Sequence, residues 1–313
     1  MAQYILKKIL FLIPTMFLVT LIVFSVMRMV PGDPVELILR DVQNPELAER
    51  LREEMGLNKH IVLQYFDWLG RVFTLDLGTS LHNGQPVIGT MFSHFLVSLQ
   101  VVSISIVLAS LLALIGGTLA AWQQNRSLDV LTVMFSITCM SVPSFWLGIA
   151  FILLFGVGLQ WLPTVGYVSP TEDFLESIQF LILPVAALAI TEMGGILRMV
   201  RSTTIDVLRQ EYITHARAKG LSEMTVLFRH ALKNTAAPVL TLIGFAFGTL
   251  LGGAAVIETV FTLPGIGRLL VTSIYNRDYA MVQGIMLLIS FTYIFINLIV
   301  DLLYPVFDPR VKL

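Results

Sequence analysis

The chain reads LVSLQVVSISIVLASLLALIGGTLAAWQQN from residue 96 to residue 125, without a single Asp, Glu, Lys or Arg. A helix needs about 20 apolar residues to cross the hydrocarbon core of a bilayer. This stretch is therefore predicted to span a membrane, at about residues 96–122. The composition agrees, because 56% of the residues are hydrophobic and 13% are charged, whereas soluble domains carry roughly 25% charged residues. The fold class predicted is an all-α membrane protein.

Five further spans are predicted outward from this one. Four follow apolar runs at about residues 9–30, 131–158, 236–257 and 281–303. The fifth, at about 179–200, contains Glu192 and the pair Gly194-Gly195, and a charge at mid-helix costs roughly 2.5–3.5 kcal/mol on insertion scales. We include it because, without it, the number of crossings would be odd. The basic segments before and after it in the sequence would then lie on the wrong sides of the membrane.

The distribution of basic residues predicts the orientation. Lys7 and Lys8 precede the first span, whose apolar run is too long for a cleavable signal peptide. Six crossings then place most Lys and Arg inside, whereas the short outer loops carry only Arg268 and Arg277, as the positive-inside rule requires. We expect cytoplasmic termini, an outer cap loop at 31–95 and a cytoplasmic segment at 201–234. Within one membrane domain of residues 1–313, the cap is predicted to hold two helices, one from Asn44-Pro45 to Gly56 and one over 60–73.

Several function classes are excluded or unsupported. The net charge of −1 gives no electrostatic basis for a nucleic-acid partner. Cys139 is the one cysteine, so an internal disulfide is impossible, and the five histidines are too scattered to predict a metal site. The sequence has no phosphate-binding loop of the Gly-x4-Gly-Lys-Ser/Thr type, no Gly-x-Ser-x-Gly elbow and no His-Glu-x-x-His pair. We expect a non-catalytic chain with no metal and no cofactor of its own.

Charged residues and glycines inside the spans are the candidates for a transport pathway or gate. Intramembrane charges usually face the interior of a bundle or a water-filled path. Glu192 lies deepest by sequence, and an interhelical pair is an equally weighted alternative. Glu258 and Asp301 lie at the ends of spans, where a structural role is favoured. Gly244, Gly248 and Gly252 are spaced by four and share one helix face, which suits either close helix packing or a pathway.

The segment 201–234 is the most unusual part of the chain. It carries six basic residues. Its centre predicts a short helix that ends at Gly220 and a second helix from about Ser222 to Lys233. Small residues beside positive charges suggest a surface that docks onto a partner. The residues concerned are Thr214, His215, Ala216, Arg217, Ala218, Lys219 and Gly220.

These residues, followed by His230-Ala231-Leu232-Lys233-Asn234 and Pro238, resemble the coupling segment of binding-protein-dependent ABC importer permeases. The similarity is to the dipeptide/oligopeptide/nickel branch and to the first (B-type) of its two permease subunits. In the wider superfamily, Glu and Ala are usual where Thr214 and His215 stand here, so Arg217 or Lys219 is a candidate for the contact with the ATPase. Further matching motifs are Pro31-Gly32-Asp33-Pro34, Asp76-Leu77-Gly78-Thr79-Ser80, Ser141-Val142-Pro143-Ser144-Phe145-Trp146, Glu258-Thr259-Val260-Phe261, Leu263-Pro264-Gly265-Ile266-Gly267-Arg268, Asn276-Arg277-Asp278-Tyr279, Asp301-Leu302-Leu303-Tyr304 and Asp308-Pro309-Arg310.

The resemblance implies a type I (MetI-like) permease fold with a cytoplasmic coupling helix, in the cytoplasmic (inner) membrane of a prokaryote. It implies a homologous second permease, two ATPase subunits that bind ATP and Mg, an extracytoplasmic substrate-binding protein, and lipid around the spans. The substrates it implies are peptides or nickel and metal-chelate complexes, with glutathione-like compounds among them.

Two other function classes were weighed. An ion-gradient-driven secondary transporter could use Glu192 as a proton site, but the sequence lacks the inverted repeats and paired broken helices of such carriers. An intramembrane enzyme could use Glu258 or Asp301, but no second carboxylate or serine–histidine pair accompanies either one at useful spacing.

Overall fold

The computed structural model describes residues 2–29, 35, 45–54, 56–80 and 82–307. The described residues form helices and one isolated antiparallel bridge between Thr79 and Pro86. The helices are α1 (Ala2–Met29), α3 (Pro45–Glu54), α4 (Ile61–Phe73), α5 (Val87–Trp122), α6 (Ser127–Ser141), α7 (Ser144–Phe151), η1 (Ile152–Gly158), α8 (Phe174–Leu208), α9 (Glu211–Ala218), α10 (Glu223–Thr225), η2 (Val226–Ala231), α11 (Leu232–Gly253), α12 (Ala255–Val260), α13 (Ile266–Tyr275) and α14 (Tyr279–Phe307).

Five described helices are long and apolar enough to cross a membrane: α1, α5, α8, the continuous helix Glu223–Gly253, and α14. A sixth crossing is possible through α6 and the α7–η1 pair, which are bent by 94° at the break between them. The span predicted at 131–158 therefore consists of two helical parts that meet at a sharp bend. Pro143 explains the break, because the residue before a proline is disfavoured in the helical conformation, and Val142 is extended with φ −95° and ψ 122°.

Several spans are longer than the sequence predicted, α5 and α8 among them. Helix α5 begins at Val87 rather than near Leu96, so the end of the predicted outer loop is helical. Helix α8 runs from Phe174 to Leu208 instead of 179–200, and Asp173 caps its start by accepting a hydrogen bond from the Glu176 amide at 2.9 Å. Polar residues at both helix ends hid these extensions, because hydropathy marks the lipid-facing part of a helix and not its full length.

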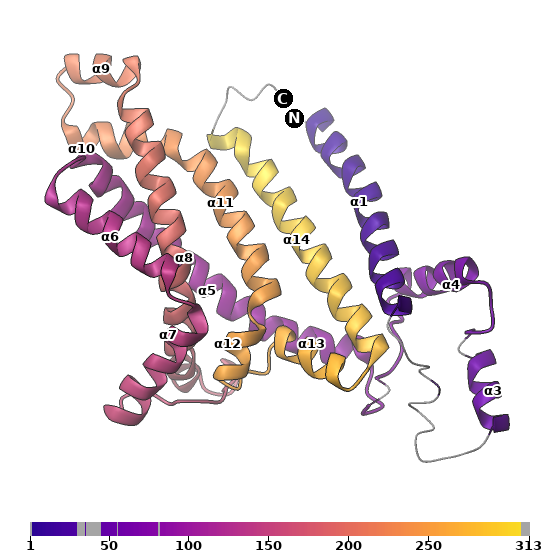
Figure 1. Cartoon of the computed structure of the whole chain (residues 1–313). Coiled ribbons are helices and arrows are strands. Elements are labelled where there is room, and N and C mark those ends of the chain that lie inside the picture. The colour runs from indigo at the N-terminus through magenta and orange to yellow at the C-terminus, as the bar shows by residue number, and fades with distance from the viewer. Residues whose placement is uncertain (1, 30–34, 36–44, 55, 81, 308–313) are drawn as a thin grey trace.

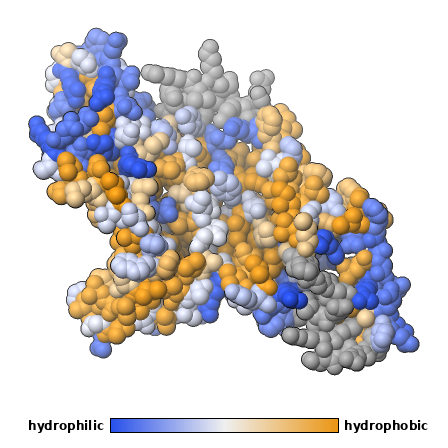
Figure 2. All heavy atoms as spheres, viewed as in Figure 1, coloured by the Kyte–Doolittle hydropathy of each residue, from blue (hydrophilic) through white to orange (hydrophobic). Residues whose placement is uncertain are grey.

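Helices α5 and α8 pack along each other and form the centre of the molecule (Figure 1). Gly117 makes this approach possible, because a methyl group there would lie 2.8 Å from the Leu197 carbonyl oxygen. Buried side chains from α5, α8, α11, α13 and α14 form the main hydrophobic core. The outward faces of the spans remain apolar, as Figure 2 shows over much of the visible surface, which suits contact with lipid or with a second membrane subunit.

The two predicted cap helices are present as α3 and α4. Helix α4 lies against α1, where the hydroxyls of Tyr65 and Thr20 are 2.8 Å apart and Phe24 packs on the rings of Tyr65 and Trp68. The predicted cap residue Asn44 and the motifs Pro31–Pro34 and Asp308–Arg310 lie outside the described residues.

Candidate functional site

The coupling segment forms a compact elbow, which we define as residues 209–222, around α9. Figure 1 places α9 at the same end of the molecule as the start of α1 and the last described turn of α14, away from α12 and α13. Ile213, Ala216 and Val226 are buried together beneath this elbow, with Leu208 and Tyr212 packed against them. Helix α9 is therefore held to the membrane helices by its own small core.

Gly220 makes the turn at the end of α9. Its φ of +79° lies in the left-handed region, which costs other residues about 1–2 kcal/mol. The Gly220 amide donates to the Arg217 carbonyl at 2.9 Å and the Leu221 amide donates to the Ala216 carbonyl at 3.4 Å. This is a glycine-terminated helix end, so the C-cap predicted at Gly220 is confirmed.

An ion pair closes the elbow across this turn. The Arg217 guanidinium donates to both carboxylate oxygens of Glu223, at 2.8 and 3.0 Å. Such bidentate pairs fix orientation as well as distance. Thr214, His215, Ala218 and Lys219 stay exposed, whereas Ala216 is buried.

The second helix of the elbow differs from its prediction. The Ser222 hydroxyl accepts from the Thr225 amide at 3.4 Å, as expected of a helix cap. The helix that starts there does not stop near Lys233 but continues to Gly253 as one unit of 31 residues. No Gly or Pro lies between Ser222 and Ala237 to end it. The helix that follows the elbow and the fifth span are therefore one continuous helix.

Sequence reasoning missed the apolar side chains beside the elbow. Met224 and Phe228 are exposed at the start of this helix, and Leu221 is exposed in the turn just before it. Met224 and Phe228 are four residues apart and so lie on one side of the helix, and that spacing is the signal that could have found them.

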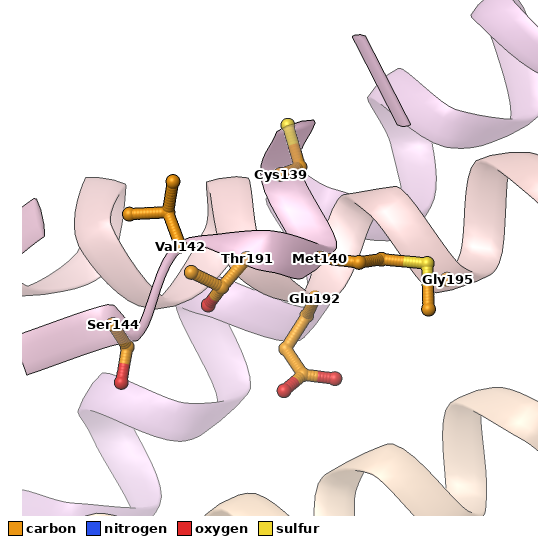
Figure 3. A pocket seen from close by; sticks show the side chains of 7 residues that line it. All are labelled: Cys139, Met140, Val142, Ser144, Thr191, Glu192 and Gly195. Atoms are coloured by element: carbon orange, nitrogen blue, oxygen red, sulfur yellow. The ribbon is translucent and has the colours of Figure 1, made fainter. Parts of the chain in front are cut away.

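Glu192 lies in the middle of α8, beside the break between α6 and α7 (Figure 3). A cavity of about 360 Å³ opens between the end of α6, the start of α7 and the middle of α8. Its lining residues are Cys139, Met140, Val142, Ser144, Thr191, Glu192 and Gly195. Among the residues that the structure describes, none forms a hydrogen bond or an ion pair with the Glu192 carboxylate. The interhelical pair weighed for Glu192 is absent from this part of the chain.

The adjacent glycines of α8 do different work. A methyl group on Gly194 would lie 2.7 Å from the Ser136 carbonyl oxygen and 2.9 Å from Met140 Cγ, whereas Gly195 has no atom within 4 Å of that position. The Ser136 hydroxyl also donates to the Gly194 carbonyl at 2.9 Å. Gly194 therefore allows α6 to approach α8, and Gly195 leaves the cavity open.

Glu258 is fully buried on α12, at the end of the molecule opposite the elbow (Figure 1). Its carboxylate accepts hydrogen bonds from the Ser98 hydroxyl and, at 2.8 Å, from the Arg268 amide at the start of α13. The Ser98 hydroxyl in turn accepts from the Ile266 amide at 2.7 Å. A carboxylate suits the exposed amides of a helix N-terminus, so Glu258 ties α12, α13 and α5 together.

The glycine face of α11 is covered over two of its three positions. Gly244 lies against Val300 and Gly248 against the Tyr293 ring, both on α14, so any larger residue would overlap them. Gly252 has open space within 4 Å. Close helix packing thus accounts for Gly244 and Gly248.

Two buried polar links were also missed. Asp129, at the start of α6, accepts from the Arg201 guanidinium on α8, with Nη2 at 2.7 Å, and from the Asn125 amide at 2.9 Å. At the start of α14, Ser80 donates to Asp278, which caps this helix. These partners are 72 and 198 residues apart, so no spacing rule could have paired them.

The comparisons with known proteins fit this architecture. Residues 113–313 match the family described as the binding-protein-dependent transport system inner membrane component. Residues 1–108 match the N-terminal part described for the same membrane components. The chain belongs to this family. It is a multi-pass inner-membrane permease of an ABC importer, and this membership does not support the ion-gradient alternative.

Curated relatives match over the whole chain. A dipeptide transport system permease protein of Alkalihalophilus pseudofirmus is 35% identical over 332 residues and covers 100% of both chains. A glutathione transport system permease protein of Escherichia coli O6:H1 is 38% identical over 312 residues and covers 100% of this chain and 99% of its own. The crystal structure of an amino acid ABC transporter with histidines aligns at a TM-score of 0.49 with 15% identity, covering 72% of this chain and 95% of that one.

Proposed function

We propose that this permease is the first of two membrane subunits in an importer of peptides. Two relatives that cover its full length are named for dipeptide and glutathione transport. Nickel and metal-chelate complexes, which the family resemblance also implies, are the competing cargo. The permease itself would hydrolyse nothing and bind no cofactor, and would work with a homologous permease, two ATPase subunits and an extracytoplasmic binding protein.

The observation that carries this proposal is the rigid elbow. Its small core, its left-handed glycine and the Arg217–Glu223 pair fix the shape of α9. A rigid surface can transmit a displacement, whereas a solvated loop would absorb it. We propose that Thr214, His215, Ala218 and Lys219 contact an ATPase, with Leu221, Met224 and Phe228 adding apolar area.

The proposed orientation in the membrane is based on the end of the molecule that carries the elbow. The start of α1, the end of α14 and the elbow lie together (Figure 1), and this end carries Lys8, Arg209, Arg217 and Lys219. By the positive-inside rule, it would face the cytoplasm.

For the pathway, we propose distinct roles for the candidate residues. Glu192 would line the route, since it borders an open cavity. Gly244 and Gly248 would let α14 approach α11, Gly252 would leave space above them, and Glu258 would hold the outer helices that close the route.

Cysteine crosslinking tests the docking surface. In membranes that contain the full importer, Ala218→Cys should form an adduct with the ATPase through a short thiol-reactive crosslinker. Thr171→Cys, in an outer loop, should not. The native chain serves as the blank because its single Cys139 is buried. An adduct from Thr171→Cys but none from Ala218→Cys would overturn the assignment.

Uptake tests the cargo. Proteoliposomes that hold the complete importer should take up tritiated dipeptides or glutathione only with ATP inside and binding protein outside. Uptake of ⁶³Ni²⁺ in preference to every peptide tested would overturn the peptide assignment.

A further inference from the structure

The cavity beside Glu192 combines three features that point to a positively charged ligand. The first is the carboxylate itself, which lies in the middle of a membrane helix without a partner among the described residues. A charged side chain in a membrane normally pairs with another group or faces an aqueous cavity. None of the described residues that line this cavity is an arginine, lysine or histidine, so none of them supplies a cation to pair with the carboxylate.

The second feature is the end of α6. The last four carbonyl groups of a helix lack partners within it, and they carry the negative end of the helix dipole. Helix α6 ends at Ser141, and Met140 and Val142 line the cavity on either side of that end. Pro143 follows and has no amide hydrogen to offer these carbonyls. The break therefore adds acceptors and negative potential near Glu192.

The third feature is the direction of the side chains in Figure 3. The Ser144 hydroxyl and the Glu192 carboxylate point to the same side of the α6–α7 connection, whereas the Cys139 thiol points to the opposite side. The Thr191 hydroxyl donates within its own helix, to the Ala187 and Leu188 carbonyls. The free polar atoms on this side are thus oxygen acceptors.

We propose that this cavity binds the protonated α-amino group of a peptide in transit. An ammonium group has three N–H donors and no acceptor, which matches a carboxylate, a hydroxyl and helix-terminal carbonyls. The volume of about 360 Å³ lies within the range of small-molecule sites. This proposal rests on the proposed peptide importer and adds a transient subsite for the amino terminus of the cargo.

A metal ion fits this cavity less well. Among the described residues, no three His, Cys, Asp or Glu side chains gather where they could hold a metal. Among the described residues that line the cavity, Glu192 alone offers an anionic oxygen, and divalent cations prefer several. A hydrogen-bonding organic cation needs only one carboxylate with acceptors around it.

Transport measurements on the complete importer test the role of the charge. At saturating binding protein, Glu192→Gln should lower the maximal rate of alanyl-alanine or glutathione uptake roughly tenfold, since hydrogen bonds to charged groups are the strong ones. Glu192→Asp keeps the charge and should recover much of the rate. Glu176→Gln is the matched control, since it makes the same change at an exposed position of α8 and should transport normally.

Photolabelling separates a binding site from a gate that merely needs a carboxylate. The probe is a dipeptide with a diazirine-bearing leucine, added to the complete importer in nanodiscs. Mass spectrometry should find the label between residues 139 and 195 in the wild type. The N-acetylated probe, which lacks the ammonium group, should label roughly tenfold less. Equal labelling by both probes, or no label in this region, would overturn the subsite.

The two proposals fail in different ways. If the wild-type importer takes up no peptide at all, the proposed cargo is wrong. If it takes up peptides and Glu192→Gln does so at the same rate, the cargo stands and the amino-terminal subsite is wrong. Should Glu192→Gln not assemble, labelling of the wild type by the free and acetylated probes decides alone.

Discussion

Two glutamates of this permease share an apolar setting, and their neighbours give them opposite roles. Glu258 is enclosed, and the Ser98 hydroxyl and the Arg268 amide satisfy its oxygens. Glu192 borders an open cavity and has no such donors among the described residues. Satisfied buried polar groups stabilise a fold, whereas an unsatisfied one is costly and is therefore the better candidate for meeting a ligand. A hydropathy profile cannot separate these cases, because it registers only one charge within each apolar run.

Gly220 supports a sharp prediction at this scale. Gly220→Val should lower ATP-dependent uptake roughly tenfold or more while the protein still inserts, because a β-branched residue with positive φ is strained by about 1–2 kcal/mol or more. The strain would rotate α9 away from its partner. Uptake and membrane level should be measured together.

Gly220→Asn is the matched control, since asparagine tolerates the left-handed region better than other residues. It should keep most of the uptake. A steric clash cannot explain a difference in uptake between the two variants. Apart from the chain neighbours, no described atom lies within 4 Å of the position that a Cβ at residue 220 would take. Normal uptake by the valine variant would show that the Gly220 turn does not contribute to coupling through the elbow.

At the scale of helices, the contact between α6 and α8 rests on Gly194, the Ser136 hydroxyl and the Asp129–Arg201 ion pair. The glycine sets the distance in the middle, and the ion pair fixes the start of α6 against the last turns of α8. The bend at Val142–Pro143 lies just beyond this contact. A well-held α6 therefore presents its terminal carbonyls at a fixed place beside Glu192.

The glycine pair offers a prediction with an internal comparison. Gly194→Ala should destabilise the assembled permease by about 1–3 kcal/mol, the usual cost of overpacking. Gly195→Ala should leave the stability unchanged or slightly higher, since its methyl group meets open space and alanine favours a helix over glycine. Thermal unfolding of the two purified complexes checks this. A lower midpoint for Gly195→Ala than for Gly194→Ala would contradict the packing described here.

The sequence predicts much at this scale, and its failures have a common cause. Uncharged runs predicted where the apolar helices lie, and the pattern of 45–73 predicted the two cap helices. The bend was missed because an apolar run predicts a membrane segment without predicting whether its helix is straight. Pro143 was the signal that could have indicated the break. The pairs Asp129–Arg201 and Ser98–Glu258 were missed because their members are 72 and 160 residues apart. The first pair joins α6 to α8 and the second joins α5 to α12, so only tertiary packing brings their members together.

At the scale of the whole molecule, the first and last spans lie side by side. The Lys8 ammonium of α1 is 2.6 Å from an Asp301 carboxylate oxygen of α14. A cavity of about 400 Å³, lined mostly by apolar groups, lies between these two helices. Helix α1 otherwise meets the rest of the described chain mainly through α4, where Tyr65 and Trp68 pack. The pair Lys8–Asp301 thus fastens the N-terminal end of an otherwise peripheral helix.

Charge reversal tests this fastening. Asp301→Lys should lower the amount of assembled importer about threefold, since it replaces an attractive contact between α1 and α14 by a repulsion between two like charges. Adding Lys8→Asp should restore most of it. Lys59→Asp is the control, because its ion pair with Asp67 is exposed and such pairs contribute little. Copurification of the ATPase with the permease gives the measurement, and a double variant no better than Asp301→Lys alone would contradict the pairing.

The helix that begins at the elbow and ends at Gly253 has a mechanical consequence. At 1.5 Å per residue, its 31 residues form a rod of about 45 Å, long enough to cross a bilayer. If this helix pivots about a buried point between its two ends, a tilt of one end moves the other end in the opposite direction. The π-helical turn of η2 sits where such a rod leaves the elbow, which is where some of that tilt could be taken up as bending.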